Sequence, residues 1–337
     1  MQDFSLNIYL LEHRPTETLD SLPDRYLSTD VFGGRKLGNR LFEFVSIFGL
    51  ARRLRRKPLF QYDRTDSEEL VAMFNDAMPG LVEQYTIINR TLIKGDVEHV
   101  TFHTECCIYD DPSRLQKYTA KFLNLNGYIF MSWKYFSDYR QEVLSFVRSA
   151  NQSISDLPVS SQNASVLCIH SRRTDFLDGL RQGTDPKFTK DAVEFVQNRS
   201  SFLCVSPPKP VLFLPVNQTS LQIVVFGDDV DFETRQFGTD TVHVHVSSKP
   251  PNEDLIYSRH HCDYFLITAP ASSFGWWLAY LSKGDHVYYT DIRATNDFTY
   301  RDGRLIPDDF YPPTWIPLKY DEHRRITIGP PNEKRVF

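Results

Sequence analysis

The stretch Val166-Leu167-Cys168-Ile169-His170-Ser171-Arg172-Arg173-Thr174-Asp175 decides the fold prediction, because a short apolar run changes abruptly into charged residues. Residues 166–169 are typical of a buried strand in a parallel sheet. Charged side chains that follow such a strand lie at its carboxyl end, where open parallel sheets bind their ligands. The stretch therefore predicts an α/β fold with a ligand site beside Arg172 and Arg173.

Two later segments repeat this pattern of a buried strand followed by polar residues. The run 223–226 ends in Gly227-Asp228-Asp229-Val230-Asp231, and the run 264–268 precedes Ala269-Pro270-Ala271-Ser272-Ser273. The carboxyl ends of parallel strands share one edge of a sheet. We therefore expect the three polar clusters to converge on one crevice.

A strand, a glycine loop and a helix are predicted near the N-terminus. Residues 26–32 favour a strand, residues 33–39 form a glycine loop, and apolar residues from Leu41 to Leu54 recur at helical spacing. Asn39 is expected to cap this helix. The loop has neither the ending of a P-loop nor the spacing of a dinucleotide fingerprint, so it predicts neither mechanism.

Length and composition indicate two globular domains. The chain has 337 residues, of which 41% are hydrophobic and 24% are charged. The polar segment 151–164 is the best linker candidate, and we place one domain at residues 1–160 and the other at 161–337. The formal charge of -5 argues against a nucleic-acid binder, which needs a net basic face.

The cysteines and the glycosylation sequons bear on the compartment. Five cysteines without C-x-x-C spacing disfavour a zinc ribbon and leave at least one thiol unpaired within the chain. Five N-x-[ST] sequons, at Asn89, Asn151, Asn163, Asn198 and Asn217, favour a luminal glycoprotein. The sequence contains neither a signal peptide nor a membrane span, so the expectation is a Golgi luminal region whose membrane anchor is absent from this sequence.

The adjacent guanidinium groups of Arg172 and Arg173 are suited to bind a diphosphate, with Asp175 orienting one of them. Ser272 and Ser273 are expected to open a helix whose free N–H groups can also bind phosphate, while Phe274 packs behind them. The alternative interpretations are a structural ion-pair cluster and an ordinary capped core helix.

The sequence Asp-x-Asp at Asp229 and Asp231 supports a rival chemistry. Metal-dependent glycosyltransferases present a divalent ion to a nucleotide sugar in this way. The histidine pairs at 243/245 and 260/261 are poor candidates for zinc. His260 and His261 are adjacent and point to different faces, while the alternation of His243 and His245 is that of one face of a strand.

Together the motifs resemble glycosyltransferase family 11, the α-1,2-fucosyltransferases, and in particular its nematode branch. The segment 34–42 resembles the family's G-x-L-G-N-Q-x-F loop, 170–175 its H-x-R-R-x-D, 226–229 its F-S-D-D and 272–277 its S-S-F-S-W-W. The chain departs from these patterns at Arg40, Thr174, Ala271 and Gly275.

The resemblance implies a GT-B-like architecture of two Rossmann-type domains whose parallel sheets face a cleft. It implies GDP-β-L-fucose as the donor, no metal or cofactor, and inverting transfer to a glycan, expected at O2 of a terminal galactose. In this interpretation Arg172, Arg173 and Asp175 are catalytic, and the donor is bound by His170, Gly38, Asn39, Asp228, Ser272, Ser273 and Phe274. The general base is expected among Asp175, Asp178 and Glu43.

Three alternatives remain open from the sequence. One is a metal-dependent glycosyltransferase that uses Asp229 and Asp231. Another is a glycan-binding relative without catalytic activity. A glycosidase is disfavoured because the sequence identifies no pair of flanking carboxylates.

Overall fold

The computed structural model describes residues 24–30, 36–62, 65–93, 95–102, 105–149, 156–203, 220–238 and 243–332. They form two compact units, residues 1–148 with 304–310 and residues 149–303 with 311–337. Each unit contains its own largely parallel sheet, which confirms the predicted α/β class with two parallel-sheet units of GT-B-like type.

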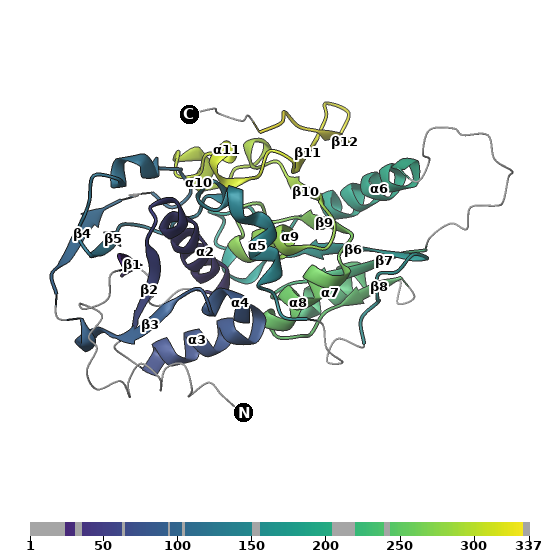
Figure 1. The fold of residues 1–337 in the computed structure, drawn as a ribbon. Helices are drawn as coiled ribbons and strands as arrows, with labels where there is room; N and C mark the ends of the chain where they lie inside the picture. The colour runs from purple at the N-terminus through teal and green to yellow at the C-terminus, as the bar shows by residue number, and fades with distance from the viewer. Residues whose placement is uncertain are drawn as a thin grey trace, which may run out of the picture. The chain divides into compact units, whose positions relative to one another are not determined.

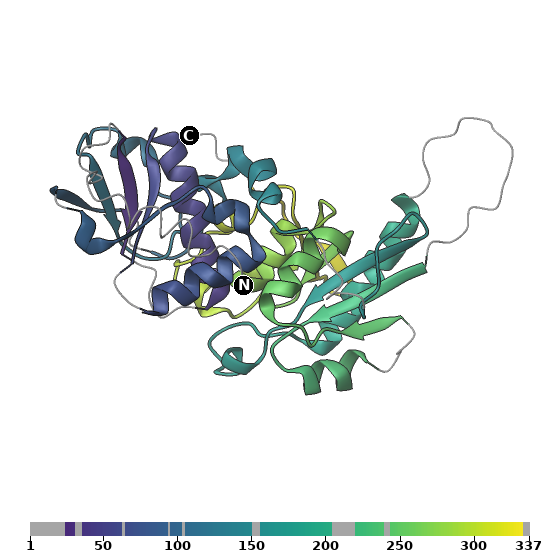
Figure 2. The same cartoon turned by 60° about the horizontal axis from the view of Figure 1, so that its bottom comes forward.

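The first unit is built on a five-stranded parallel sheet in the order β3-β2-β1-β5-β4. Figure 1 labels these strands, and Figure 2 shows the same sheet from a second direction. The strands are β1 (Tyr26–Thr29), β2 (Lys57–Tyr62), β3 (Thr86–Asn89), β4 (Val97–Thr101) and β5 (Phe122–Asn126). The helices are α2 (Leu37–Arg53), α3 (Thr65–Ala77), α4 (Pro79–Val82), α5 (Arg140–Ser145) and α11 (Pro307–Phe310).

Helix α2 begins three residues earlier than the sequence suggests. Lys36, and not Asn39, is its N-cap, and no side chain caps it. The backbone N–H groups of Asn39 and Arg40 donate to the Lys36 carbonyl at 3.1 and 3.3 Å, so Asn39 already lies inside the first turn. The expectation that Asn39 caps this helix is therefore wrong.

Residues 304–310 group with the first unit, although the sequence division assigns them to the second domain. Asp309 explains this placement, because its carboxylate lies 2.6 Å from the Lys134 ammonium group and both side chains are nearly buried. The Ser132 hydroxyl donates to the Asp309 carbonyl at 2.6 Å. Phe310 packs against Phe42 of α2, with 6.0 Å between ring centroids.

The second unit is built on a seven-stranded sheet in the order β12-β11-β10-β9-β6-β7-β8, in which only β12 is antiparallel to its neighbour. The strands are β6 (Ala164–His170), β7 (Ser220–Phe226), β8 (Val244–Val246), β9 (Tyr264–Ile267), β10 (His286–Thr290), β11 (Ile316–Tyr320) and β12 (Ile326–Ile328). The helices are α6 (Pro186–Leu203), α7 (Val230–Phe237), α8 (Pro251–His261), α9 (Ser273–Leu281) and α10 (Phe298–Arg301).

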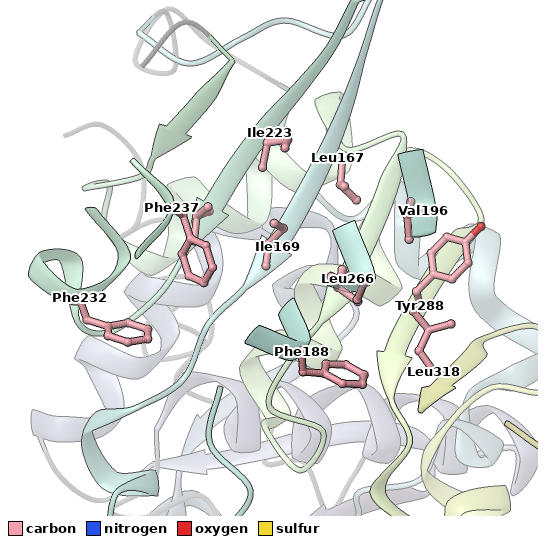
Figure 3. Packing of buried hydrophobic residues seen from close by; sticks show 12 residues of the cluster. Leu167, Ile169, Phe188, Val196, Ile223, Phe232, Phe237, Leu266, Tyr288 and Leu318 are labelled. Carbon is pink, nitrogen blue, oxygen red and sulfur yellow. The ribbon is translucent and has the colours of Figure 1, made fainter. Parts of the chain in front are cut away.

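Strand β6 is an interior strand of this sheet, between β7 and β9, as expected of a buried parallel strand. Leu167 and Ile169 point to the face that α6 and α7 cover, where they join Phe188, Val196 and other buried side chains (Figure 3). Cys168 is fully buried and forms a disulfide with Cys262, at the end of α8. Both faces of β6 are therefore buried, and only its carboxyl end leads to polar residues.

No helix of the described residues is long and apolar enough to cross a membrane.

Candidate functional site

The three polar clusters of the second unit converge at the carboxyl ends of β6, β7 and β9. The backbone N–H of Arg173 donates to Asp228 Oδ1 at 2.8 Å, which joins the loop after β6 to the loop after β7. His170 Nε2 lies 3.5 Å from the Ser272 hydroxyl, which joins β6 to the start of α9. The three polar clusters therefore meet at one edge of the sheet, as expected.

Arg172 is fixed by two carboxylates. Its Nε and Nη2 lie 2.9 and 2.8 Å from Asp175 Oδ1, and its Nε lies 3.2 Å from Asp228 Oδ2. The Arg172 side chain is only 13% exposed. Asp175 thus orients Arg172, as the sequence suggests, and the guanidinium group is held in one direction before any ligand arrives.

Arg173 is held differently, by an aromatic ring. Its guanidinium carbon lies 3.9 Å from the centroid of Phe232, in the first turn of α7. Its Nε lies 3.9 Å from Asp229 Oδ2, too far for a hydrogen bond. A cation stacked on a ring keeps its N–H donors available at the edge of the guanidinium plane. Arg173 is therefore the less neutralised of the two arginines.

Asp228 and Asp229 have structural partners of their own. Asp228 accepts hydrogen bonds from the Arg173 backbone and from the Thr174 hydroxyl. Asp229 caps α7 by accepting from the Phe232 N–H at 3.0 Å, whereas Asp231 is exposed. Within the described residues no group of three or more His, Cys, Asp or Glu side chains could hold a metal ion.

The start of α9 has the predicted geometry. Ser272 is its N-cap and accepts from the Gly275 N–H at 3.4 Å, and Ser273 and Phe274 form the first turn. Ser272 is nearly buried, while Ser273 and Phe274 are half-buried. The first turn of α9 therefore lies close to the carboxyl end of β6.

His170 is a buried, neutral side chain. Burial lowers the pKa of His170 to about 3, and the charge of Arg172 lowers it further while that of Asp228 opposes the shift. Its ring packs at 6.2 Å from Phe274 and directly over Gly275. At neutral pH the ring adds no charge beside the arginines.

Gly275 lies directly against the His170 ring, with no room for a side chain between them. A Cβ at position 275 would lie 2.4 Å from His170 Nδ1.

Gly275→Ala is therefore expected to destabilise the protein by about 1–3 kcal/mol, because the buried ring must move. Urea unfolding of Gly275→Ala, His170→Ala and the double variant checks this. The two changes should be non-additive, since removing the ring removes the clash, and additive effects would contradict the contact.

The remaining predicted residues are two in the first turn of α2 and the candidate bases. Gly38 and Asn39 belong to the first turn of α2 in the first unit, and Glu43 is fully buried in the same helix. Asp178 Oδ1 accepts from the N–H groups of Leu180 and Arg181 at 2.9 and 3.3 Å. Of the three candidate bases, Glu43 is shielded from solvent, whereas Asp175 and Asp178 lie at the surface of the arginine loop, residues 171–185.

Several residues of the site escaped the sequence analysis. Thr184 accepts from the Arg172 backbone N–H at 2.8 Å and pairs with Thr268 at 2.8 Å, which closes the arginine loop. Phe232 stacks against Arg173. The sequence signal that could have identified it is its position three residues after Asp229, the N-cap of α7. Thr184 has no sequence signal, because its partner is 84 residues away.

Glu233 is a further residue that the sequence did not single out. It is fully buried in α7, and a Cβ on Gly227 would lie 2.1 Å from its Oε1. Burial raises the pKa of Glu233 to about 7; Asp228 and Asp229 add to the shift, and the Ser171 hydroxyl opposes it. This buried carboxyl group therefore gains its charge close to neutral pH.

The raised pKa of Glu233 gives a pH-dependent stability. The folded protein holds this proton more tightly than the unfolded chain, so the contribution to the free energy of unfolding is lost as pH rises from about 4.5 to about 7. Glu233→Gln should therefore become more stable than wild type by about 1–3 kcal/mol as pH rises through this window. Urea unfolding at several pH values checks it, with exposed Asp231→Asn as the matched control. Parallel curves for wild type and Glu233→Gln would contradict the prediction.

Comparison with known proteins places this site in a family. Residues 210–319 match the model of the family "Glycosyl transferase family 11". The chain is 37% identical to the Caenorhabditis elegans protein "Putative glycosyltransferase C06E1.7", over 92% of this chain and 85% of that protein. It is 33% identical to a C. elegans "Galactoside 2-alpha-L-fucosyltransferase", over 86% of this chain and 76% of that protein.

Among solved structures, Arabidopsis thaliana FUT1 in complex with GDP aligns with a TM-score of 0.44 and 12% identity, over 91% of this chain and 78% of that chain. The sequence relatives are similar over most of their own lengths, and the match includes the segments that carry Asp228 and Ser272. The chain is a glycosyltransferase, and it belongs to glycosyltransferase family 11.

Proposed function

We propose that the protein transfers L-fucose from GDP-β-L-fucose to a glycan hydroxyl, O2 of a terminal galactose, by an inverting and metal-independent reaction. The observation that carries the proposal is the pair Arg172 and Arg173 beside the N-terminus of α9, with Arg172 held by two carboxylates. The transferred fucose and the galactoside acceptor are taken from the relative that is named a galactoside 2-alpha-L-fucosyltransferase, and the donor from the resemblance to the family.

The proposed reaction breaks the bond between the anomeric carbon of fucose and the β-phosphate oxygen. Negative charge builds on the departing phosphate, and fixed cations stabilise that charge more in the transition state than in the substrate. Arg172 and Arg173 supply the cations, while the first N–H groups of α9 share the load. The acceptor oxygen forms the new bond from the opposite face, and its proton passes to a base.

The residues of the arginine loop have distinct proposed roles. Asp175 and Asp228 keep Arg172 in place, and Asp228 also fixes the backbone of Arg173. The neutral His170 holds Ser272 and Phe274 in position for the nucleotide. Gly38 and Asn39 are also proposed to contact the donor.

A disulfide and two exposed glycosylation sequons support a proposal for the cellular compartment. We infer that the protein works in the Golgi lumen, because a disulfide between Cys168 and Cys262 persists in an oxidising compartment. The sequon residues Asn163 and Asn198 are exposed, as glycosylation requires.

A donor panel tests the proposal. The purified chain is incubated with GDP-fucose, GDP-mannose or UDP-galactose, with EDTA or with Mn²⁺, and a galactose-terminated acceptor. We expect nucleotide release from GDP-fucose alone, undiminished by EDTA, together with a fucosylated product. Release from a UDP-sugar only with Mn²⁺ would instead support the metal-dependent rival that uses Asp229 and Asp231. Binding of the glycan without turnover of any donor would support a non-catalytic relative.

A further inference from the structure

The second unit contains a cavity of about 230 Å³ beside the end of the arginine loop, and neither Arg172 nor Arg173 lines it. Its lining comes from the end of the arginine loop and the start of α6, and from the carboxyl ends of β9, β10 and β11. Strand β6 has β7 on one side and β9 on the other, so the strand order reverses between β6 and β9. Open parallel sheets bind ligands at such a reversal.

Two threonines that line the cavity, Thr268 and Thr290, are fixed by hydrogen bonds, and Thr184 lies behind them. Thr268 Oγ1 donates to the His170 carbonyl at 2.6 Å and lies 2.8 Å from Thr184 Oγ1. Thr290 Oγ1 donates to the Thr268 carbonyl at 3.1 Å. Thr184 in turn accepts from the Arg172 backbone, so these threonines are one hydrogen bond away from the arginine site.

The rim offers charged groups of both signs. Asp185 Oδ1 accepts from the Phe188 N–H at 2.8 Å, and its Oδ2 has hydrogen-bonding capacity left. Within the described residues the ammonium group of Lys319 has no carboxylate partner. Asp291, at the buried end, is paired with Arg293 at 2.7 Å. The negative charges of Asp185 and Asp291 are thus balanced by the positive charges of Lys319 and Arg293. This balance disfavours a phosphate as the ligand and favours a neutral molecule.

The walls are partly apolar. Tyr320 and Phe188 meet edge to face with 5.3 Å between ring centroids, and Leu318 and Ala294 complete this side. Aromatic and aliphatic groups beside a few polar groups are typical of small-molecule sites, whose usual volume is about 300–1,000 Å³. A cavity slightly below that range suits one sugar ring, which presents both C–H faces and hydroxyl groups.

We propose that this cavity binds one neutral monosaccharide ring of the acceptor glycan, with Lys319 and Asp185 bonding its hydroxyl groups. The proposal rests on the proposed glycosyl transfer and adds a specificity site for the acceptor. It predicts that the cavity affects acceptor binding without affecting the nucleotide, because only the arginine side of the loop meets the diphosphate.

The test measures sugar binding without turnover. Methyl β-D-galactopyranoside is titrated into the full chain and followed by ligand-observed NMR, for wild type, Ala294→Trp, Lys319→Ala and the control Lys190→Ala. Ala294 is exposed at the rim, so a tryptophan there fills the opening, and Lys190 is exposed on α6 outside the lining. GDP titrations of all four proteins check that the arginine site is intact.

We expect saturable binding by wild type and Lys190→Ala, no binding by Ala294→Trp, and binding at least about tenfold weaker for Lys319→Ala. With GDP-fucose as donor, the acceptor KM should rise by the same factor while the donor KM stays unchanged. Absence of saturable binding by wild type, equal binding by Ala294→Trp, or a change in the donor KM alone would overturn the assignment. If wild type binds the sugar and the cavity variants do not, but wild type transfers no fucose, the sugar site stands and the proposed fucosyl transfer fails.

Discussion

Arg173→Ala is expected to lower kcat for GDP-fucose by about a hundredfold to a thousandfold, while leaving the free energy of unfolding nearly unchanged. The guanidinium group stacks on Phe232 and forms no close ion pair, since Asp229 is 3.9 Å from its Nε. Its removal therefore breaks little that holds the fold. It does remove the cation that we propose stabilises charge on the departing β-phosphate.

Arg172→Ala is expected to lower both the catalytic rate and the stability of the protein, unlike Arg173→Ala. This change should lower kcat by a similar factor and also destabilise the protein, because Asp175 and Asp228 lose the cation that they share. Steady-state kinetics with GDP-fucose and urea unfolding measure the two effects.

Arg235→Ala is the matched control for both arginine variants, since Arg235 is exposed in the last turn of α7. Its kcat should equal that of wild type. A kcat for Arg173→Ala within about threefold of wild type would contradict the proposed role of that arginine.

Loss of the Cys168–Cys262 disulfide is expected to lower the free energy of unfolding by about 3–5 kcal/mol. The bond joins β6 to the end of α8 across 94 residues of sequence, and both sulfurs are fully buried. A long closed loop restricts the unfolded chain strongly, and the cross-link also fixes the strand that leads to His170 and Arg172. The double variant Cys168→Ala/Cys262→Ala removes both effects.

Urea unfolding with and without reductant measures this contribution. Wild type in reductant should fall to the stability of the double variant, which reductant should leave unchanged. Reduction of the other disulfide, Cys106–Cys107, should matter little because its cysteines are adjacent and it closes no chain loop. Equal stability of wild type with and without reductant, or free Cys168 in the denatured unreduced protein, would show that the bond is absent.

Much of the second unit could be predicted because its signals are local. The apolar run 166–169 lies within β6, the run 223–226 ends β7, and Ser272 caps α9, as expected. Parallel pairing of β6 with both β7 and β9 then brings their polar ends together. Side chains that directly follow parallel neighbouring strands lie at the same edge of the sheet. The grouping of Arg172, Asp228 and Ser272 therefore follows from the strands alone.

The features that the sequence did not predict depend on distant partners. Cys168 could have paired with any other cysteine, because spacing does not determine connectivity. Asp309 joins the first unit through Lys134, which is 175 residues away. The start of α2 was misplaced because Asn39 is a good capping residue by type, whereas the backbone of Lys36 already accepts the first helical hydrogen bonds.

The central claim is that arginines, and not a metal ion, bind the diphosphate of the donor. Calorimetric titration of GDP into wild type and Arg173→Ala in EDTA tests it most directly. The account predicts saturable GDP binding by wild type that EDTA does not weaken, and affinity at least about tenfold lower for Arg173→Ala. GDP binding that needs Mn²⁺, or equal affinity of the two proteins in EDTA, would contradict it.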